Sequence, residues 1–386
     1  MFKKLIKKYT PTNNNRYKIR NWHTDNYIEY NYDYNRLALN GYAKNVVAFR
    51  AVKMIATSIS SIEIVINKKI GINTKNIINH PVLKILKNPN NLLSGMDFIE
   101  NLVSHMLIGG GAYILKIGLD DKNPVELHLL HPNNTVTLVK NDEIIGYEYH
   151  YNKKCMNYYI NNDNGDCDVL HIKSFHPTND TAGLSSMNVA MTSINQYQYA
   201  TEWNCSLLKN SARPSGALIV KNKFNDTLTE EQFDRIKEQI SDLYSGSSNS
   251  GRPVLLEGGL EWKEMSVSPK EMDFVEIKNS AARDIALSFG VPPQMLGIPG
   301  DNTYSNLIEA RLALWEQTIL PLTDKILNGL SRWLLNDKNL MFSYNKDKIS
   351  ALSPRREKLW SYINNASFMS NQEKREALGL DSKLDE

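Results

Sequence analysis

The sequence predicts an α+β fold, in which helices and strands form separate runs and a mainly helical section follows. Residues 41–185 combine helical patterns at 45–61 and 96–108 with segments of alternating apolar and polar residues, which are typical of half-buried strands. Helices with one apolar stripe follow from residue 187 onward. We expect a small α/β module between two of these helices, at residues 214–269.

The first 185 residues are expected to hold an arm and the mixed domain. Residues 1–40 are rich in Asn and Tyr and show no clean period, so we expect an N-terminal arm that becomes ordered only on assembly. The strands expected in the mixed domain are 112–118, 125–130, 135–140 and 144–151.

The module should lie between a helix at 187–211, which ends before Pro214, and a second helix at 271–289. Within it we expect strands at 217–220, 253–256 and 260–265, an acidic helix over 230–242 and a flexible SGSSNSG loop at 245–251. The apolar stripe of the second helix consists of Phe274, Ile277, Ala281, Ile285 and Phe289. Gly290 suits a C-cap, and Pro292 and Pro293 stop this helix.

A loop with the sequence GIPGDNT follows the double proline. Its residues are small or turn-forming and have almost nothing to bury, so we expect an exposed, mobile segment. The loop consists of Gly297, Ile298, Pro299, Gly300, Asp301, Asn302 and Thr303.

The longest helix is expected over residues 305–335. Pro321 cannot donate a hydrogen bond to the carbonyl of Gln317, which predicts a kink at that point. The stripe of this helix consists of Ile308, Leu312, Trp315, Ile319, Leu322, Ile326, Leu330 and Trp333. One more helix is expected in the tail, at 351–386.

The composition is that of a soluble globular chain. The 386 residues are enough for two or three cores, and 41% of them are hydrophobic. The mean hydropathy is -0.42, and no apolar run is long enough to span a bilayer. The basic start, MFKKLIKKYT, lacks the apolar core of a signal peptide. We favour a solvated basic tail over a membrane-surface anchor and expect no membrane partner.

The net charge of +3 argues against tight binding to nucleic acid. Such binding usually needs clustered Lys and Arg, whereas charges of both signs alternate in segments such as EEQFDRIKEQISD, residues 230–242. The isoelectric point is about 8.5. Any contact with DNA should therefore be weak and sliding, because each strong phosphate contact would become a barrier to movement.

No catalytic, cofactor or metal site is expected from the motifs. Cys155 and Cys167, taken with His171 and His176, lack the short cysteine spacing of a zinc knuckle. The three glycines at 109–111 follow a helix and precede a strand, the reverse of a phosphate-binding loop. Free thiols and packed histidines are the simpler interpretation, and any ATPase must be a separate subunit.

Several motifs resemble the portal proteins of HK97-type tailed bacteriophages. The motifs are FGVPPQMLG followed by TYSNLIEAR, HPVLKILKNPN, MDFIENLVSHMLIGGGAYILK, VELHLLHPNNTVTL, LLKNSARPSGALIV, GRPVLLEGGLEWKEMSVSPKEMDFVE and the closing FMSNQEKREALGL. Their order matches the family over roughly residues 40–380. The departures are small: the family often has a bulkier residue at the position of Gly110 and an aromatic one at that of His128.

The resemblance implies a portal-type subunit. It assigns residues 41–185 to an α+β wing, 186–213 and 270–290 to stem helices, 214–269 to a small α/β clip, 291–304 to a tunnel loop, 305–350 to a kinked wing helix and strand, and 351–386 to a short helical crown. Phe274, Ile277, Ala281 and Ile285 would lie at the stem interface between subunits. Glu231, Asp234 and Glu238 would form the partner surface of the clip.

The function implied is that of a channel at one capsid vertex. Family members form homo-oligomeric rings, usually of twelve subunits, in the virion or phage-like particle and assemble in the bacterial host cytoplasm. The implied partners are double-stranded DNA passing non-specifically, the terminase large subunit, the major capsid protein and a head-tail adaptor. An infectious phage, a defective prophage and a gene-transfer particle all fit.

Two other classes remain open. An enzyme would need a nucleophile, base or metal constellation, for which the motifs give no support. A non-channel oligomeric structural or scaffold protein would share the helices, but it would have no reason for a mobile loop of small residues at the stem end.

Overall fold

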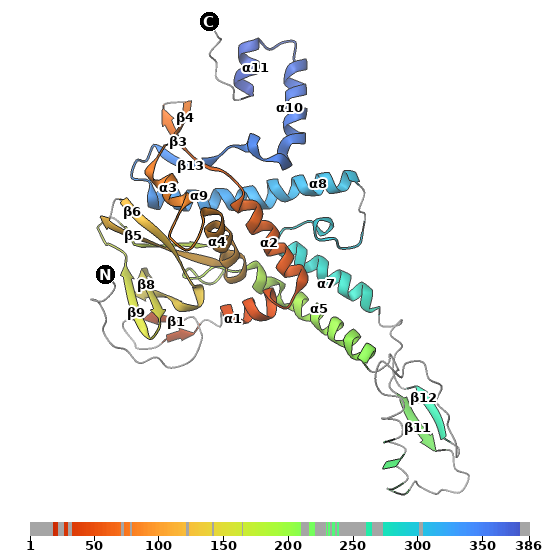
Figure 1. The fold of residues 1–386 in the computed structure, drawn as a ribbon. Helices are drawn as coiled ribbons and strands as arrows, with labels where there is room; N and C mark the ends of the chain where they lie inside the picture. Colours follow the sequence, from red (N-terminus) through yellow and green to blue (C-terminus); the bar gives the residue numbers. More distant parts are fainter. Residues whose placement is uncertain are drawn as a thin grey trace. The chain divides into compact units, whose positions relative to one another are not determined.

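The computed structural model describes residues 18–21, 27–29, 33–70, 73–77, 79–120, 123–140, 143–163, 165–209, 216–220, 229, 231, 234–235, 238, 260–264, 273–300 and 304–378. The chain divides into two compact units (Figure 1). The first comprises Met1–Met191 together with Ala286–Glu386, and the second comprises Thr192–Ile285.

Two helices form the centre of the first unit, α2 (Val46–Ser60) and α4 (Gly95–Gly109), and they pack against each other. The buried Asn45 caps α2, because its Oδ1 accepts hydrogen bonds from the backbone N–H groups of Val47 and Ala48 at 3.0 and 2.9 Å. Both helices were expected from the sequence, and their bounds differ from the expected ones by one residue. A shorter helix, α3 (Pro81–Lys87), lies beside α4.

Three sheets accompany these helices. One has the order β10-β5-β6, one the order β2-β1-β7-β8-β9, and one the order β13-β3-β4. The strands are β1 (Lys18–Asn21), β2 (Tyr27–Glu29), β3 (Ile64–Ile70), β4 (Asn73–Ile77), β5 (Gly111–Asp120), β6 (Asn123–Leu130), β7 (Thr135–Lys140), β8 (Glu143–Tyr151), β9 (Lys154–Tyr159), β10 (Val169–Lys173) and β13 (Leu340–Tyr344). The four strands expected in the mixed domain correspond to β5 to β8.

Residues distant in sequence meet in the third sheet. Strand β13 pairs antiparallel with β3, and Tyr344 lies opposite Ile64. The edge strand β4 follows β3 through a short connection. The third sheet is therefore completed by segments that lie far apart in the sequence.

The described residues of the expected N-terminal arm form strands and short helices, and ordering of the arm on assembly stays a prediction. Strand β1 pairs in parallel with β7 within the same chain, with Arg20 opposite Leu138. A short helix, α1 (Tyr34–Arg36), continues into a π-helix, η1 (Leu37–Tyr42). Tyr34 and Leu37 are three residues apart, share one face and are both buried. This apolar pair packs the segment into the first unit.

The irregularity expected from Pro321 takes the form of a π-helical turn. Helix α8 (Tyr304–Leu314) passes into η5 (Trp315–Ile319) and then into α9 (Leu320–Leu334). The N–H of Leu320 bonds to the carbonyl of Trp315, five residues back, directly before the proline. A wider turn at this point relieves the clash that the proline ring would make in a regular helix.

The second unit contains parts of two long helices and a strand pair. Helix α5 (Ser186–Lys209) and helix α7 (Phe274–Ser288) run side by side here, with Trp203 stacked on Phe274 at 6.0 Å and the Lys278 ammonium 5.0 Å from the ring centre of Tyr197 (Figure 1). Strands β11 (Gly216–Val220) and β12 (Leu260–Glu264) pair antiparallel and correspond to two of the expected strands. The third expected strand, at 253–256, and the 245–251 loop lie outside the described residues.

The tail holds two helices where one was expected, α10 (Ser353–Asn365) and α11 (Asn371–Ala377). Ser370 starts the second one with a capping box. The Glu373 carboxylate accepts from the Ser370 N–H at 2.7 Å, and the Glu373 N–H donates to Ser370 Oγ at 3.3 Å. Among the helices of the described residues, none is both long and apolar enough to cross a membrane.

Candidate functional site

The C-terminal end of α7 is hydrogen-bonded to η5, the π-helical turn. Gly290 has a φ of +66°, and a Cβ there would lie 2.7 Å from Thr318 Oγ1. The same hydroxyl donates a hydrogen bond to the Gly290 carbonyl at 2.6 Å. The expected glycine C-cap is confirmed, and its partner on η5 could not be seen in the sequence. A 3-10 turn, η4 (Pro293–Leu296), follows the cap.

The loop predicted to be exposed is only partly so. Gly297 has a φ of +71°, and a Cβ added there would have nothing within 4 Å; Pro299 and Gly300 are exposed. Ile298 is only 6% exposed, so the expectation that the loop has almost nothing to bury is wrong for this residue. Its N–H donates to the carbonyl of Pro293 at 3.2 Å, which holds it against the preceding turn. Asp301, Asn302 and Thr303 lie outside the described residues.

The apolar stripe of α7 changes along the helix. Ala281 and Ile285 have no exposed surface, whereas Phe274 and Ile277 are half-buried. The prediction that these four residues meet a neighbouring subunit remains a prediction. Because Ile285 is already covered in the single chain, a substitution there would disturb the subunit before it disturbed a contact between subunits.

Several large apolar side chains on the two long helices are exposed. Val275 is 71% exposed and Leu287 78% exposed on α7, and Tyr199 and Trp203 are exposed on α5. The sequence pattern had selected the face that the chain itself buries. Large apolar side chains left at the surface of long helices are typical of an interface with another protein.

The acidic residues Glu231, Asp234 and Glu238 are exposed. Together with Arg235 they are helical, in agreement with the helix expected over 230–242, most of which lies outside the described residues.

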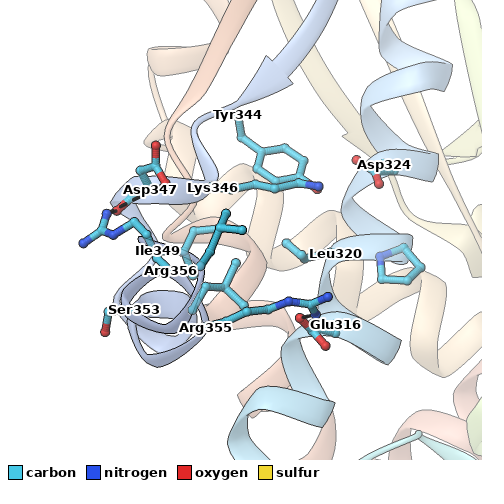
Figure 2. Close-up of a pocket in the computed structure, with 13 residues that line it drawn as sticks. Glu316, Leu320, Asp324, Tyr344, Lys346, Asp347, Ile349, Ser353, Arg355 and Arg356 are labelled. Atoms are coloured by element: carbon cyan, nitrogen blue, oxygen red, sulfur yellow. Dashed lines mark hydrogen bonds and ion pairs between the residues drawn. The ribbon is translucent and has the colours of Figure 1, made fainter. Parts of the chain in front are cut away.

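A pocket lies between α9 and the start of α10 (Figure 2). The residues that line it are Glu316, Leu320, Pro321, Asp324, Tyr344, Lys346, Asp347, Ile349, Leu352, Ser353, Arg355, Arg356 and Leu359. Arg355 forms an ion pair with Glu316 of the π-turn, and Arg356 donates to the carbonyl of Asp347 at 2.6 Å. Burial, followed by the hydrogen bond to Asp324, raises the pKa of the Tyr344 hydroxyl. These charged groups thus hold the tail to the kinked helix.

Two buried clusters contain histidines that the sequence pattern did not select. Tyr34 Oη lies 2.7 Å from His105 Nδ1, and His131 lies edge-on to both rings. Burial and the neighbouring His131 lower the pKa of His105 to about 4. His171 stacks on Tyr113 at 4.1 Å, and its burial lowers its pKa to about 3. Both imidazoles are therefore neutral at pH 7 and serve as packing groups.

Comparisons with sequence relatives agree with one another. The phage portal protein family model matches residues 46–379. An uncharacterized protein of Rickettsia bellii (strain RML369-C) is 46% identical over 348 residues, which are 89% of each chain. The probable portal protein of Streptomyces phage phiC31 is 25% identical, over 81% of this chain and 69% of that protein.

Solved structures give the same picture. A chain of the virion of a native gene transfer agent particle is 37% identical, covers 90% of this chain and 94% of its own length, and superposes with a TM-score of 0.70. A chain of the neck of that kind of particle, computed with C12 symmetry, gives a TM-score of 0.69 at 36% identity and the same coverage. An HK97 family portal protein from Corynebacterium diphtheriae, at 16% identity and over 78% of this chain and 91% of its own, shares the fold with a TM-score of 0.55.

The fold and its two long helices define a ring-forming subunit of a phage-like particle. The chain belongs to the phage portal protein family, the channel proteins of the capsid vertex.

Proposed function

We propose that twelve copies of this chain surround a channel through which a terminase large subunit drives double-stranded DNA into the particle. The proposed number of twelve rests on the 36% identity, over 90% of this chain, to a chain of a gene transfer agent neck that was computed with C12 symmetry. In this proposal the ring assembles in the bacterial host cytoplasm and acts structurally, while the motor hydrolyses ATP.

The long helices, α5 and α7, form the stem of the proposed ring. A closed ring is built from heterologous contacts, in which one face of a subunit meets a different face of the next. The exposed Val275, Tyr199 and Trp203 supply apolar surface for such contacts in the second unit, and Leu287 supplies it in the first. Phe274 and Ile277, which the chain half-buries, supply the edge of the stripe.

The loop after the double proline faces the DNA in this proposal. Reading of base sequence needs a side chain held rigidly against a groove edge of the DNA. A loop that contains Gly297 and Gly300 cannot hold Asn302 in that way, so we expect no base readout. Asp301, the only charge in the loop, would keep phosphates from adhering.

The helix over 230–242 is proposed as the surface at which the terminase docks first and the head-tail adaptor later. Reversing the charges of Glu231, Asp234 and Glu238, each to Lys, should leave ring formation unchanged and weaken terminase binding in a pull-down, because all three are exposed. Reversal of Glu357 on α10, also exposed, is a matched control and should bind as the wild type does. Unchanged binding by the triple variant would remove this helix from consideration.

Imaging of the purified protein tests the ring itself. Negatively stained particles should show rings with a central hole, and class averages should give twelve subunits. A discrete monomer at all salt concentrations would contradict the proposal, and closed oligomers without a hole would favour a structural protein that does not conduct DNA.

A further inference from the structure

The hairpin of β8 and β9 carries a group of side chains that the portal function does not use. Glu148 and His150 are two residues apart on β8 and therefore point to the same face of the sheet. Cys155 on β9 lies directly opposite His150 in the ladder, and Asn157 lies opposite Glu148. The four side chains thus form a two-by-two patch on one face of the hairpin.

Three of these side chains bring metal-binding atoms together. One ligand atom each from Glu148, His150 and Cys155 lies within 4.8 Å of the other two. His150 Nε2 is 2.8 Å from Glu148 Oε1, and Cys155 Sγ is 3.7 Å from Asn157 Oδ1. Zinc takes nitrogen, thiolate sulfur and carboxylate oxygen together, at bond lengths that place the ligand atoms about 3.3 to 3.8 Å apart around a tetrahedron. Rotation of these side chains, moving the ligand atoms by about 1 Å, would bring the distances between them to the values of a zinc site.

The backbone holds this arrangement in register. The hairpin turns through Asn152 and Lys153, which have φ values of +48° and +63°. Two consecutive residues in this region define a type I′ turn, whose twist matches that of the flanking strands. A two-residue turn allows only one pairing register between β8 and β9, so His150 and Cys155 stay opposite each other.

We propose that Glu148, His150 and Cys155 form a site for a thiophilic transition-metal ion, with Zn²⁺ as the natural occupant. Asn157 Oδ1 or a water completes the tetrahedron. The bound ion takes the place of the proton between His150 and Glu148, and the Cys155 thiol loses its proton as the S–metal bond forms. Cross-linking the two strands in this way would stiffen β9, which is the edge strand of its sheet.

The spacing of the cysteines could not reveal this site. The combination considered from the sequence joined Cys155 to Cys167 and His171, but His171 is buried against Tyr113. The partners of Cys155 come instead from the neighbouring strand, across a two-residue turn. Only the pairing register places them together.

Titration of the purified full chain with Co²⁺ alone tests the site. Tetrahedral Co²⁺ bound to a thiolate should give intense visible bands and a sulfur-to-metal charge-transfer band, both removed by one equivalent of Zn²⁺. Cys155→Ser should abolish the charge-transfer band, and His150→Asn should lower Zn²⁺ affinity by at least about tenfold, the loss already typical of changes outside the ligand shell.

The chain offers two matched controls. Cys205 is an exposed thiol on α5, and Cys205→Ser should leave the spectrum unchanged. Glu126 and His128 form the same 2.8 Å pair on β6, and His128→Asn should also have no effect. Absence of a charge-transfer band in the wild type, its persistence in Cys155→Ser, or its loss in Cys205→Ser would each overturn the proposal.

Discussion

At the scale of single residues, close backbone contact and burial set the strongest constraints. Gly110 ends α4 with a φ of +83°, and a Cβ there would lie 2.1 Å from the carbonyl oxygen of Gly183. A Cβ at Gly183 would lie 2.0 Å from the carbonyl oxygen of Gly110. The two loops touch through their backbones, so neither glycine has room for a side chain.

Gly110→Ala should therefore destabilise the first unit by several kcal/mol, measured by urea unfolding of the purified chain. Gly165 is the matched control, because its φ is +74° but nothing lies within 4 Å of an added Cβ. Gly165→Ala should cost only about 1 kcal/mol, the strain of a left-handed backbone. Equal losses in the two variants would show that the contact with Gly183 is unimportant.

The buried His105 predicts a loss of stability in mild acid. Burial lowers its folded-state pKa from 6.5 to about 4, so above pH 6.5 the imidazole is neutral in both states and has no effect. As the pH falls from 6.5 to 4, the unfolded chain takes up a proton that the folded chain refuses. The free energy of unfolding should fall by about 3 kcal/mol over this window and level off below it.

His105→Gln is the comparison for this prediction, since glutamine does not titrate. The variant should lose less stability than the wild type between pH 6.5 and 4, when both are followed by chemical unfolding. The remaining slope would belong to other buried groups such as His171. Parallel curves for the two proteins would contradict the assignment.

At the scale of elements, the sequence was most informative where one local rule decides the outcome. Gly290 ends α7 as expected, because a left-handed helix end depends on the residue itself. The pairing of β13 with β3 and the π-turn before Pro321 depend on distant segments or on a choice among several ways to relieve a clash. Neither of these two features could be derived from the local sequence pattern.

The candidate site shows the same limit. The stripe of α7 was found correctly, but spacing alone does not say whether a stripe is covered by the same chain or by a neighbour. Ile285 proves to be buried, whereas the exposed residues Val275 and Leu287 lie between the positions of the stripe. A large apolar residue outside the stripe is the signal that could have identified these exposed positions.

Leu287→Asp on α7 should block ring assembly and leave the subunit folded. The side chain is exposed in the single chain, so the charge meets an apolar surface only when a neighbour arrives. Size-exclusion chromatography with light scattering should show monomers, and circular dichroism should be unchanged. Glu276→Lys, at an exposed polar position of the same helix, is the control and should still form rings.

Ile285→Asp should behave differently, because it places a charge at a fully buried position and lowers the stability of the subunit by several kcal/mol. If Ile285→Asp folds normally and only fails to assemble, the stripe is an interface after all. Normal rings from Leu287→Asp would exclude its face from the stem contact.

At the scale of the whole molecule, the loop after the double proline should matter for DNA and not for assembly. Removing residues 299–302 spares the buried Ile298 and should leave the rings intact. Packaging of DNA, measured as nuclease-protected DNA per particle, should fall. Deletion of an exposed surface segment at 161–163 in another loop is the control and should package normally.

Asp301→Lys should slow packaging most at low salt, where attraction between the new ammonium and DNA phosphates is least screened. Asp301→Asn separates loss of the acid from gain of a base. Wild-type packaging rates in the shortened loop and in Asp301→Lys, at every salt concentration, would show that the loop is only a connector.

The pairing of β13 with β3 also determines when the β13-β3-β4 sheet can be completed. Leu340 pairs with Lys68, and the 271 residues between positions 68 and 340 must be synthesised before that edge of β3 is covered. At the usual rate of translation, about 5 to 20 residues per second, this edge of β3 stays unpaired for roughly 15 to 55 s while the chain is being synthesised. A subunit therefore gains this finished sheet only after β13 has been synthesised, and translation itself delays the moment at which copies can begin to form a ring.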